Sequence, residues 1–276
     1  MENTQTLSQL KEIDMESCVA LQEYFASRSV IITSETPGFD HGTGIAVRYR
    51  NEHYILTAAH VLRQEPRNDK ILVIGKPDSV LKEVRKDELA GAFFAGAHGH
   101  IKYSTASYIS IIDRLEDDRL GDIAALKVRQ TTHDLPYTEF HDLSGQGQAV
   151  ISEGKPVVIC GFPGALAQHA RHVITEQQGV VTTIYNAFQH IRGIPESLAQ
   201  LDPSIHFVTN FTHDIENFDP KGMSGGGAWS VPNLKNGEVW SPDQTQLLGI
   251  QSAFSRNRKL MVLVRIERMF DLLSGN

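Results

Sequence analysis

The sequence reads Gly222-Met223-Ser224-Gly225-Gly226-Gly227 in its second half, which places a serine inside a run of glycines. Glycines on both sides of Ser224 permit positive φ angles and close approach of neighbouring backbone. Such a backbone can aim N–H groups at a developing oxyanion while the hydroxyl stays accessible. A flexible glycine loop without chemistry is the alternative, and this stretch alone does not separate the two.

The pentapeptide Gly222 to Gly226 also fits G-x-S-x-G, the nucleophile elbow of α/β-hydrolases. That fold places the catalytic histidine after the serine in the chain. Here all 12 histidines precede Ser224, and the last of them is His213. A base for Ser224 must therefore come from upstream, in the chain order His, Asp, Ser.

His60 is the strongest candidate for that base, because it follows an apolar run of strand character and so enters a turn. Asp122 stands directly before another apolar run, where burial beside an imidazole is feasible. Asp117 and Asp118 are rivals by residue type. They lie in the charged stretch 114–119, which favours solvated side chains, so Asp122 is the preferred carboxylate.

Three segments resemble the signatures of trypsin-like, chymotrypsin-fold serine peptidases. They are Thr57-Ala58-Ala59-His60, Asp122-Ile123-Ala124-Ala125-Leu126 and Gly222-Met223-Ser224-Gly225-Gly226. His60 precedes Asp122 by 62 residues and Asp122 precedes Ser224 by 102, which leaves room for a barrel on each side of a cleft. Further strands of the family resemble Gly42-Thr43-Gly44-Ile45-Ala46, Val157-Val158-Ile159-Cys160-Gly161-Phe162-Pro163 and Leu248-Gly249-Ile250-Gln251-Ser252. The likeness covers nearly the whole chain after residue 28 and is greatest to non-secreted bacterial members.

The resemblance implies a serine endopeptidase that cleaves protein or peptide substrates through an acyl-enzyme. Ser224 would be the nucleophile, His60 the general base and then acid, and Asp122 the group that fixes the imidazole tautomer. The backbone N–H groups of Gly222 and Ser224 would form the oxyanion hole. No cofactor is implied.

Met223 departs from the pattern, because animal digestive relatives carry there an aspartate that pairs with a newly cut N-terminus. With Met223 in that place, such a pairing cannot occur. We therefore expect the oxyanion loop to assemble without cleavage of the chain.

The substrate-binding residues also depart from the pattern of trypsin. Phe218 stands where trypsin has the acid that selects Lys or Arg, and Asp219 follows it. If Ser252-Ala253-Phe254 lines the cleft, Phe254 falls where an open pocket usually has glycine, and the pocket would accept small or apolar residues. A shift of one residue would put Asp219 at the base of the pocket and restore basic selectivity.

Short apolar and β-branched runs separated by turn residues predict an all-β fold of two six-stranded antiparallel β-barrels. The expected strands are 29–33, 43–49, 54–59, 70–74, 123–128, 156–160, 179–185, 206–209, 226–230, 247–251 and 260–264. The expected organisation is an N-terminal helical extension at 1–27 and a peptidase domain at 28–276, comprising a first barrel at about 28–140, a second at about 150–265 and a C-terminal helix at about 266–273. Long loops are expected at 91–99, around 145–147 and at 186–204.

Composition indicates which classes of partner the protein binds and in which cellular compartment we expect it. The 26 basic residues face 33 acidic ones, the net charge is −7, and no basic block is present, which argues against a nucleic-acid partner. No apolar run reaches the roughly 18 residues of a membrane helix, so no membrane partner is expected. The first six residues lack the cationic start and apolar core of a secretion signal, and we expect a cytoplasmic protein.

The cysteines and the remaining histidines predict no disulfide framework and no metal site. Cys18 and Cys160 are the only cysteines, and each reads as a small buried apolar residue. The pairs His98 with His100 and His169 with His172 have spacings that suit a metal, but no third ligand stands near either pair.

Two other functions stay open at this stage. The same fold could serve as a catalytically silent peptide-binding or regulatory module, since a distorted oxyanion loop would silence the site without changing the motifs. An esterase would use identical residues and differ only in substrate. For the peptidase, we expect control by a regulatory protein partner, because unrestrained proteolysis in the cytoplasm would be harmful.

Overall fold

A computed structural model describes the greater part of the chain, and the description below concerns that part. The described residues are 21, 24–25, 27–32, 42–63, 70–74, 79–80, 97–103, 106–128, 139–147, 149–163, 180–211, 220–230, 241 and 244–275.

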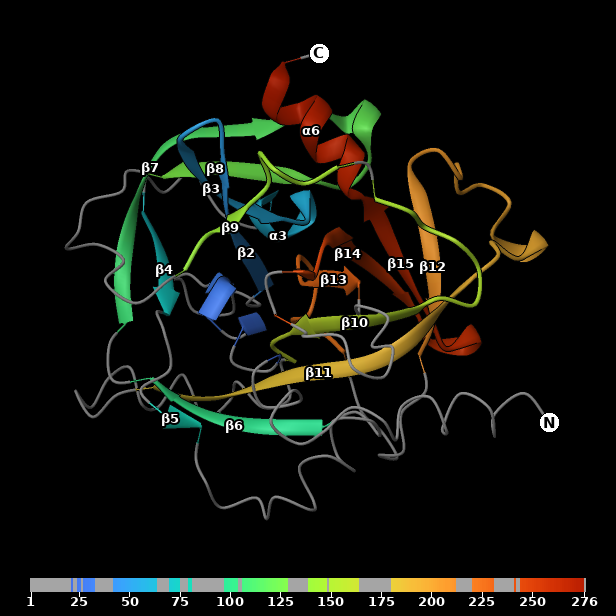
Figure 1. Ribbon diagram of the computed structural model, residues 1–276, viewed down its shortest axis with the longest axis horizontal. Coiled ribbons are helices and arrows are strands. Elements are labelled where there is room, and N and C mark those ends of the chain that lie inside the picture. The colour runs from blue at the N-terminus through green and yellow to red at the C-terminus, as the bar shows by residue number, and fades with distance from the viewer. Residues whose placement is uncertain are drawn as a thin grey trace.

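The first of the two sheets is antiparallel and runs in the order β1-β2-β3-β8-β7-β4 (Figure 1). Its strands are β1 (Ser29–Ile32), β2 (Gly42–Tyr49), β3 (Glu52–Thr57), β4 (Lys70–Ile74), β7 (Ala106–Glu116) and β8 (Ala124–Val128). The short strand β9 (His141–Asp142) adds to β2 in parallel. The two end strands β1 and β4 lie close together, so the sheet curls toward closure.

The second sheet closes into a barrel in the order β10-β13-β14-β15-β12-β11, because β11 also pairs with β10. Its strands are β10 (Pro156–Gly161), β11 (Val180–Arg192), β12 (His206–Asn210), β13 (Gly227–Ser230), β14 (Leu247–Ser255) and β15 (Leu260–Arg265). The predicted all-β class with two six-stranded antiparallel units is confirmed.

Two strands that the sequence did not predict extend the second sheet. β5 (Ser79–Val80) pairs with β6 (Ala97–Tyr103), and β6 pairs with β11 from Val180 opposite Tyr103 to Asn186 opposite Ala97. The predicted loops at 91–99 and 186–204 are therefore wrong in part, since 97–99 belongs to β6 and 186–192 to β11. Glycine and histidine content suggested a loop at 97–99, but pairing with a long partner strand supplies the backbone hydrogen bonds that make it a strand.

One hydrophobic core joins the two sheets. Ile45 and Leu56 of the first sheet belong to the same buried cluster as Val158 and Ile250 of the second, and a smaller cluster lies within the first sheet alone. Trp229 is the largest fully buried side chain and belongs to the shared cluster. Burial of such apolar surface contributes about 25 cal/mol per Å2, so the seam between the sheets is held firmly.

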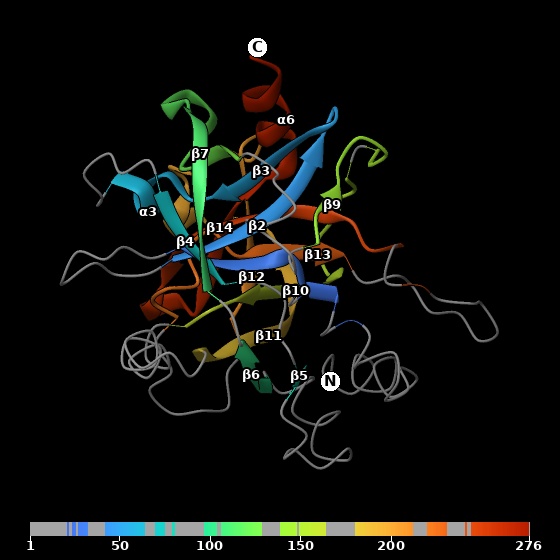
Figure 2. The same cartoon turned by 90° about the vertical axis from the view of Figure 1, so that its left-hand side faces the viewer.

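Helices are short. They are α3 (Ala59–Arg63), α6 (Ile266–Ser274) and the 3₁₀ helices η1 (Asp118–Leu120), η2 (Glu196–Leu198) and η4 (Arg256–Arg258). The predicted C-terminal helix at 266–273 matches α6, which buries Ile266, Met269 and Leu272 and contacts strands of both sheets. α6 and the β5–β6 pair lie at opposite ends of the molecule (Figures 1 and 2).

The predicted N-terminal helical extension lies mostly outside the described residues. Leu21, Tyr24 and Phe25 of this segment are helical and buried, and they belong to the shared core. Within the described part of the chain, no helix has the length and apolar character needed to cross a membrane.

Candidate active site

His60 lies on α3, directly after the buried strand β3. Ala58 and Ala59 are fully buried, so the turn that follows β3 is fixed against the core. The imidazole of His60 itself is 39% exposed. His60 thus follows directly on a buried strand end, and its ring reaches the surface between the two sheets.

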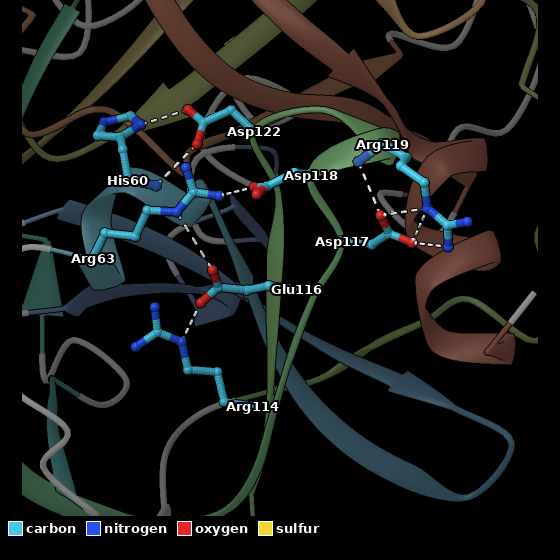
Figure 3. A network of polar contacts seen from close by, with 8 residues as sticks. All are labelled: His60, Arg63, Arg114, Glu116, Asp117, Asp118, Arg119 and Asp122. Carbon is cyan, nitrogen blue, oxygen red and sulfur yellow. Dashed lines mark hydrogen bonds and ion pairs between the residues drawn. The ribbon is translucent and has the colours of Figure 1, made fainter.

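Asp122 lies between η1 and β8, next to a glycine with a positive φ angle. Gly121 has φ 102°, and a Cβ at this position would lie 3.0 Å from Cγ2 of Ile205, which comes from the second half of the chain. Glycine therefore suits both the backbone angle and the close approach. This turn aims the Asp122 carboxylate at α3 (Figure 3).

The Asp122 carboxylate accepts two hydrogen bonds from His60. The backbone N–H of His60 donates to Oδ1 at 2.9 Å, and the ring Nδ1 lies 2.5 Å from Oδ2 (Figure 3). A carboxylate can only accept, so Nδ1 carries the proton and Nε2 of a neutral imidazole is left as a base. The structure thus brings together two of the three predicted catalytic side chains.

The pKa of Asp122 lies below its ordinary value. Burial would raise this pKa, but the hydrogen bond from the His60 ring, the charge of His60 and the hydrogen bond from its backbone lower it, and Arg63 adds to that effect. The lowering contributions prevail over burial. Asp122 is therefore held as a carboxylate beside the ring it orients.

The rival carboxylates are engaged elsewhere. Asp117 accepts hydrogen bonds from Arg119, which lower the pKa of its carboxyl to about 2. Asp118 accepts from Arg63, and Arg63 also approaches Glu116 at 3.5 Å (Figure 3). These charged groups surround the His60–Asp122 pair at the surface and do not replace Asp122.

Ser224 lies in the second of two consecutive tight turns. The Met223 N–H donates to the Pro220 carbonyl at 2.9 Å, and the Gly226 N–H donates to the Met223 carbonyl at 2.8 Å. The third residues of these turns are Gly222, with φ 95°, and Gly225, with φ 91°. Positive φ at the third position is the mark of a type II turn and explains both glycines.

The turns leave the expected oxyanion donors free. The N–H groups of Met223, Gly225 and Gly226 donate hydrogen bonds, whereas those of Gly222 and Ser224 donate none to any residue that the structure describes. Two such N–H groups, one from each of the consecutive turns, are what an oxyanion hole requires.

The nucleophile loop is anchored on both sheets. Thr43 of β2 donates its N–H to the Ser224 carbonyl at 2.8 Å, and Gly225 donates to the carbonyl of Gln251 in β14, also at 2.8 Å. A Cβ on Gly225 would overlap the Thr43 carbonyl oxygen and Oγ1 of Thr57. Because Thr57 ends the strand that leads to His60, the loop that carries Ser224 lies against the base of the His60 turn.

A hydrogen bond between the Ser224 hydroxyl and His60 is not among the contacts of the described residues. Ser224 is partly buried, and its position is known from its backbone anchors at Thr43 and at the neighbouring glycines. The structure therefore brings Ser224 to the same seam as His60 without forming the third contact of the predicted triad.

The expected substrate-binding residues are described only in part. Phe218 and Asp219 lie outside the described residues. Ser252 is buried at a bulge of β14 and donates to the Val262 carbonyl, whereas Ala253 is exposed.

Phe254 is turned toward the second barrel. Its ring is partly buried and packs edge-on against Phe211, with 5.0 Å between the ring centres. The ring is thus held in place by its own aromatic neighbour.

Among the residues that the structure describes, the remaining cysteine and the potential metal ligands do not form part of this site. Cys160 is fully buried, burial raises the pKa of its thiol to about 12, and its Sγ lies 3.3 Å from the hydroxyl of Ser29. Cys18 lies outside the described residues. Within the described ranges, no group of three or more His, Cys, Asp or Glu side chains could hold a metal ion.

Three positions near Ser224 were not assigned a role from the sequence. They are Thr43, Thr57 and Gln251, which bond to one another or to the nucleophile loop. Thr43 stood inside a recognised family motif, but its partners lie up to 179 residues away in the chain, so sequence spacing carried no signal.

Comparison with known proteins agrees with this arrangement. A family model described as trypsin-like peptidase domain matches residues 42–232, which is more than half of the chain. No curated protein matches the chain in sequence.

Two matching solved structures share the fold. One is described as human heparin binding protein and the other as the atomic resolution structure of HBP, and each has 13% identity, a TM-score of 0.53 and coverage of 92% of both chains. At this identity the likeness concerns the fold alone. The family match, which spans the described residues His60, Asp122 and Ser224, assigns the chain to the trypsin-like peptidase domain family.

Proposed function

We propose that the chain is a serine endopeptidase that hydrolyses peptide bonds through an acyl-enzyme intermediate. Membership of a peptidase family makes a protein or peptide the substrate class. The observation that carries the proposal is the pair of hydrogen bonds by which Asp122 holds the backbone and the ring of His60. A structural histidine needs no carboxylate that holds its backbone and its ring at the same time.

The proposed reaction uses the side chains already described. His60 Nε2 takes the proton of the Ser224 hydroxyl as Oγ bonds to the scissile carbonyl carbon, and the carbonyl π electrons move onto the oxygen. The free N–H groups of Gly222 and Ser224 donate to that oxyanion. The C–N bond then breaks, and protonated His60 gives its proton to the leaving amine. Water then adds to the acyl carbon while His60 takes one of its protons, the bond between that carbon and Ser224 Oγ breaks, and His60 returns the proton to Oγ as the acid leaves.

The hydrogen bond between the Ser224 hydroxyl and His60 is the contact that the proposed reaction still requires. Catalytic hydrogen bonds are often long or poorly aligned without substrate and shorten in the reacting complex. We therefore propose that substrate binding brings the Ser224 hydroxyl onto Nε2 of His60.

Activation by a new N-terminus is not part of the proposal. Met223 is fully buried, and its backbone and side chain lie so close to Gly161 that a Cβ there would be 3.2 Å away. An apolar side chain thus fills the place where an ion pair would form, and the turn at Gly222 already has its positive φ. Intact-mass analysis should find the full-length chain active, and activity confined to an N-terminally trimmed form would contradict this.

The preference for the residue before the cleaved bond is proposed to be small or apolar. Phe254, held against Phe211, would narrow a pocket that it lines together with Ser252 and Ala253. A library of peptides should be cut mainly after small or apolar residues. Cleavage chiefly after Arg or Lys would instead support Asp219 at the pocket base.

The test is cleavage of a denatured protein substrate by four purified chains. The wild type should produce fragments, while Ser224→Ala, His60→Ala and Asp122→Asn should lose about 10³-fold or more of that rate. Circular dichroism shows that each variant is folded. Equal cleavage by wild type and Ser224→Ala would overturn the proposal.

A catalytically silent peptide-binding module is the second candidate, and the missing Ser224–His60 contact favours it. Such a module would bind peptides without cutting them and would not react with a fluorophosphonate. Labelling that requires both Ser224 and His60 excludes this candidate. Control by a regulatory protein and a cytoplasmic location remain proposals, which cell fractionation and affinity purification of the Ser224→Ala chain would test.

A further inference from the structure

Thr43 sits where four hydrogen bonds converge behind the nucleophile loop. Its N–H donates to the Ser224 carbonyl at 2.8 Å, and its carbonyl accepts from the hydroxyl of Thr57 at 2.7 Å. Its own hydroxyl donates to the Gly222 carbonyl at 2.8 Å and accepts from the Phe162 N–H at 3.0 Å. Thr43 is fully buried, so no water replaces these partners.

The hydroxyl of Thr43 has one proton, which it donates to the Gly222 carbonyl. A threonine hydroxyl has a single donor, so once Oγ1 accepts from the Phe162 N–H, its proton is free to point at the Gly222 carbonyl. This bond fixes the peptide unit that follows Gly222, and the turn bond from Met223 to Pro220 fixes the same unit from its N–H side.

The Thr43 bond fixes the position of Gly222, because the anchored carbonyl belongs to the same residue as the oxyanion N–H. Gly222 has φ 95°, and its N–H belongs to the preceding peptide unit. If the carbonyl lost its anchor, Gly222 could shift and carry its N–H away from the oxyanion. The turn bond from Met223 to Pro220 holds the following unit only within the turn, whereas the Thr43 bond ties that unit to β2.

We propose that Thr43 is a positioning residue that holds the oxyanion turn in its competent form through the hydroxyl bond to Gly222. Because Phe162 follows β10 and Thr43 belongs to β2, the same hydroxyl also ties the two sheets together behind the active site. This inference rests on the proposed peptidase function. Thr43 does not touch the substrate, so its effect passes through Gly222.

The experiment compares Thr43→Val, which keeps the shape and removes the hydroxyl, with Thr43→Ser, which keeps the hydroxyl. Thr209→Val is the matched control, because Thr209 is also fully buried in a strand and its hydroxyl has no hydrogen-bond partner among the described residues. The readouts are kcat and KM on a peptide substrate and the inhibition constant of a peptide aldehyde, whose adduct with Ser224 carries a tetrahedral oxyanion.

Thr43→Val should lower kcat by about 10- to 100-fold, less than the full loss of an oxyanion donor, and should change KM little. The aldehyde should bind weaker by a similar factor. Thr43→Ser and Thr209→Val should stay near wild type in kcat and in aldehyde affinity. If Thr43 served packing alone, Thr43→Val would have a lower melting temperature, and its aldehyde affinity and its KM would change by the same factor.

The outcomes separate this inference from the function it rests on. An active wild type with an equally active Thr43→Val overturns the role of Thr43 and leaves the peptidase standing. A wild type that neither cleaves substrate nor binds the aldehyde overturns both. If Thr43→Val does not fold, Thr43→Ala takes its place, and rescue of kcat by Thr43→Ser relative to Thr43→Ala supports the proposal, whereas equal kcat values overturn it.

Discussion

At the scale of single residues, two glycines have positive φ, and one of these two, Gly225, lies in the candidate active site. Gly154 and Gly225 both have positive φ, 81° and 91°. A Cβ on Gly154 would meet nothing within 4 Å, whereas one on Gly225 would overlap Thr43 and Thr57. Substituting each glycine by alanine therefore measures the cost of backbone strain alone at Gly154 and of strain together with steric overlap at Gly225.

Gly154→Ala should cost about 1–2 kcal/mol of unfolding free energy from backbone strain alone. Gly225→Ala should cost about 1–3 kcal/mol more, because the backbone of β2 must also move, and it should abolish cleavage. Urea denaturation followed by fluorescence measures both values. Equal losses for the two variants would show that the loop does not press on Thr43 as described.

Asp122 gives a pH-dependent prediction. The pKa of its carboxyl is lower in the folded chain than the ordinary value of about 3.9, so its contribution to stability is complete above about pH 4 and is lost as the pH falls through the lowered value. The difference in unfolding free energy between wild type and Asp122→Asn should therefore shrink on acidification below about pH 4. A difference that stays constant between pH 3 and pH 7, measured by urea denaturation, would contradict this pairing with His60.

At the residue level, local context favoured Asp122 over Asp117 and Asp118, whose charged surroundings suggested solvated side chains. In the structure Asp117 and Asp118 accept hydrogen bonds from arginines, and Asp122 contacts His60. The converging bonds of Thr43 could not be predicted, because they join four segments that only folding brings together.

At the scale of elements, α3 and the segment from β7 to β8 are held together by surface charges. Arg63 of α3 binds Asp118 and approaches Glu116, and Arg114 of β7 binds Glu116 and reaches the Leu62 carbonyl at 3.3 Å (Figure 3). Arg63 is half exposed, and such pairs contribute little to stability individually.

Arg63→Gln should reduce unfolding free energy by no more than about 1 kcal/mol. It should also lower kcat/KM by less than about 10-fold, since it removes only one of the influences on Asp122. Arg63→Lys keeps the charge, so its kcat/KM should lie between the values of wild type and Arg63→Gln. A loss as large as that of Asp122→Asn in the peptide assay would mean that the charge network, and not the direct His60–Asp122 bonds, orients the imidazole.

Most strands could be predicted because they are short apolar and β-branched runs with turn residues between them. β7 was missed, since Asp113, Arg114 and Glu116 interrupt its pattern and its pairing with β8 shifts register between Ile111 and Asp113. β6 was missed because its sequence has low strand propensity and its pairing depends on β11, which lies far along the chain. Such distant pairings leave no local pattern to read.

At the scale of the whole molecule, Tyr24 and Phe25, which precede the first strand, complete the shared core. Phe25 is fully buried, and its ring centre lies 5.4 Å from that of Trp229, while the Tyr24 hydroxyl lies 2.9 Å from Nδ1 of buried His141. These two residues therefore pack against β13 and β9.

Phe25→Ala should destabilise the chain by about 3–5 kcal/mol, because it opens a cavity against Trp229. Ile112→Ala is the control, since Ile112 is 52% exposed and its loss should cost less than about 0.5 kcal/mol. Thermal unfolding of both variants tests the claim. Equal stability of Phe25→Ala and Ile112→Ala would show that the packing of Phe25 against Trp229 does not stabilise the fold.

The central claim is that His60, oriented by Asp122, makes Ser224 a nucleophile that carries an acyl group. Mixing the chain with an activated nitrophenyl ester, quenching with acid and mapping the acylated peptide by mass spectrometry tests it directly. The account predicts an acyl group on Ser224 in the wild type and its loss in His60→Ala. Acylation at another residue, or equal acylation of Ser224 in both chains, would contradict it.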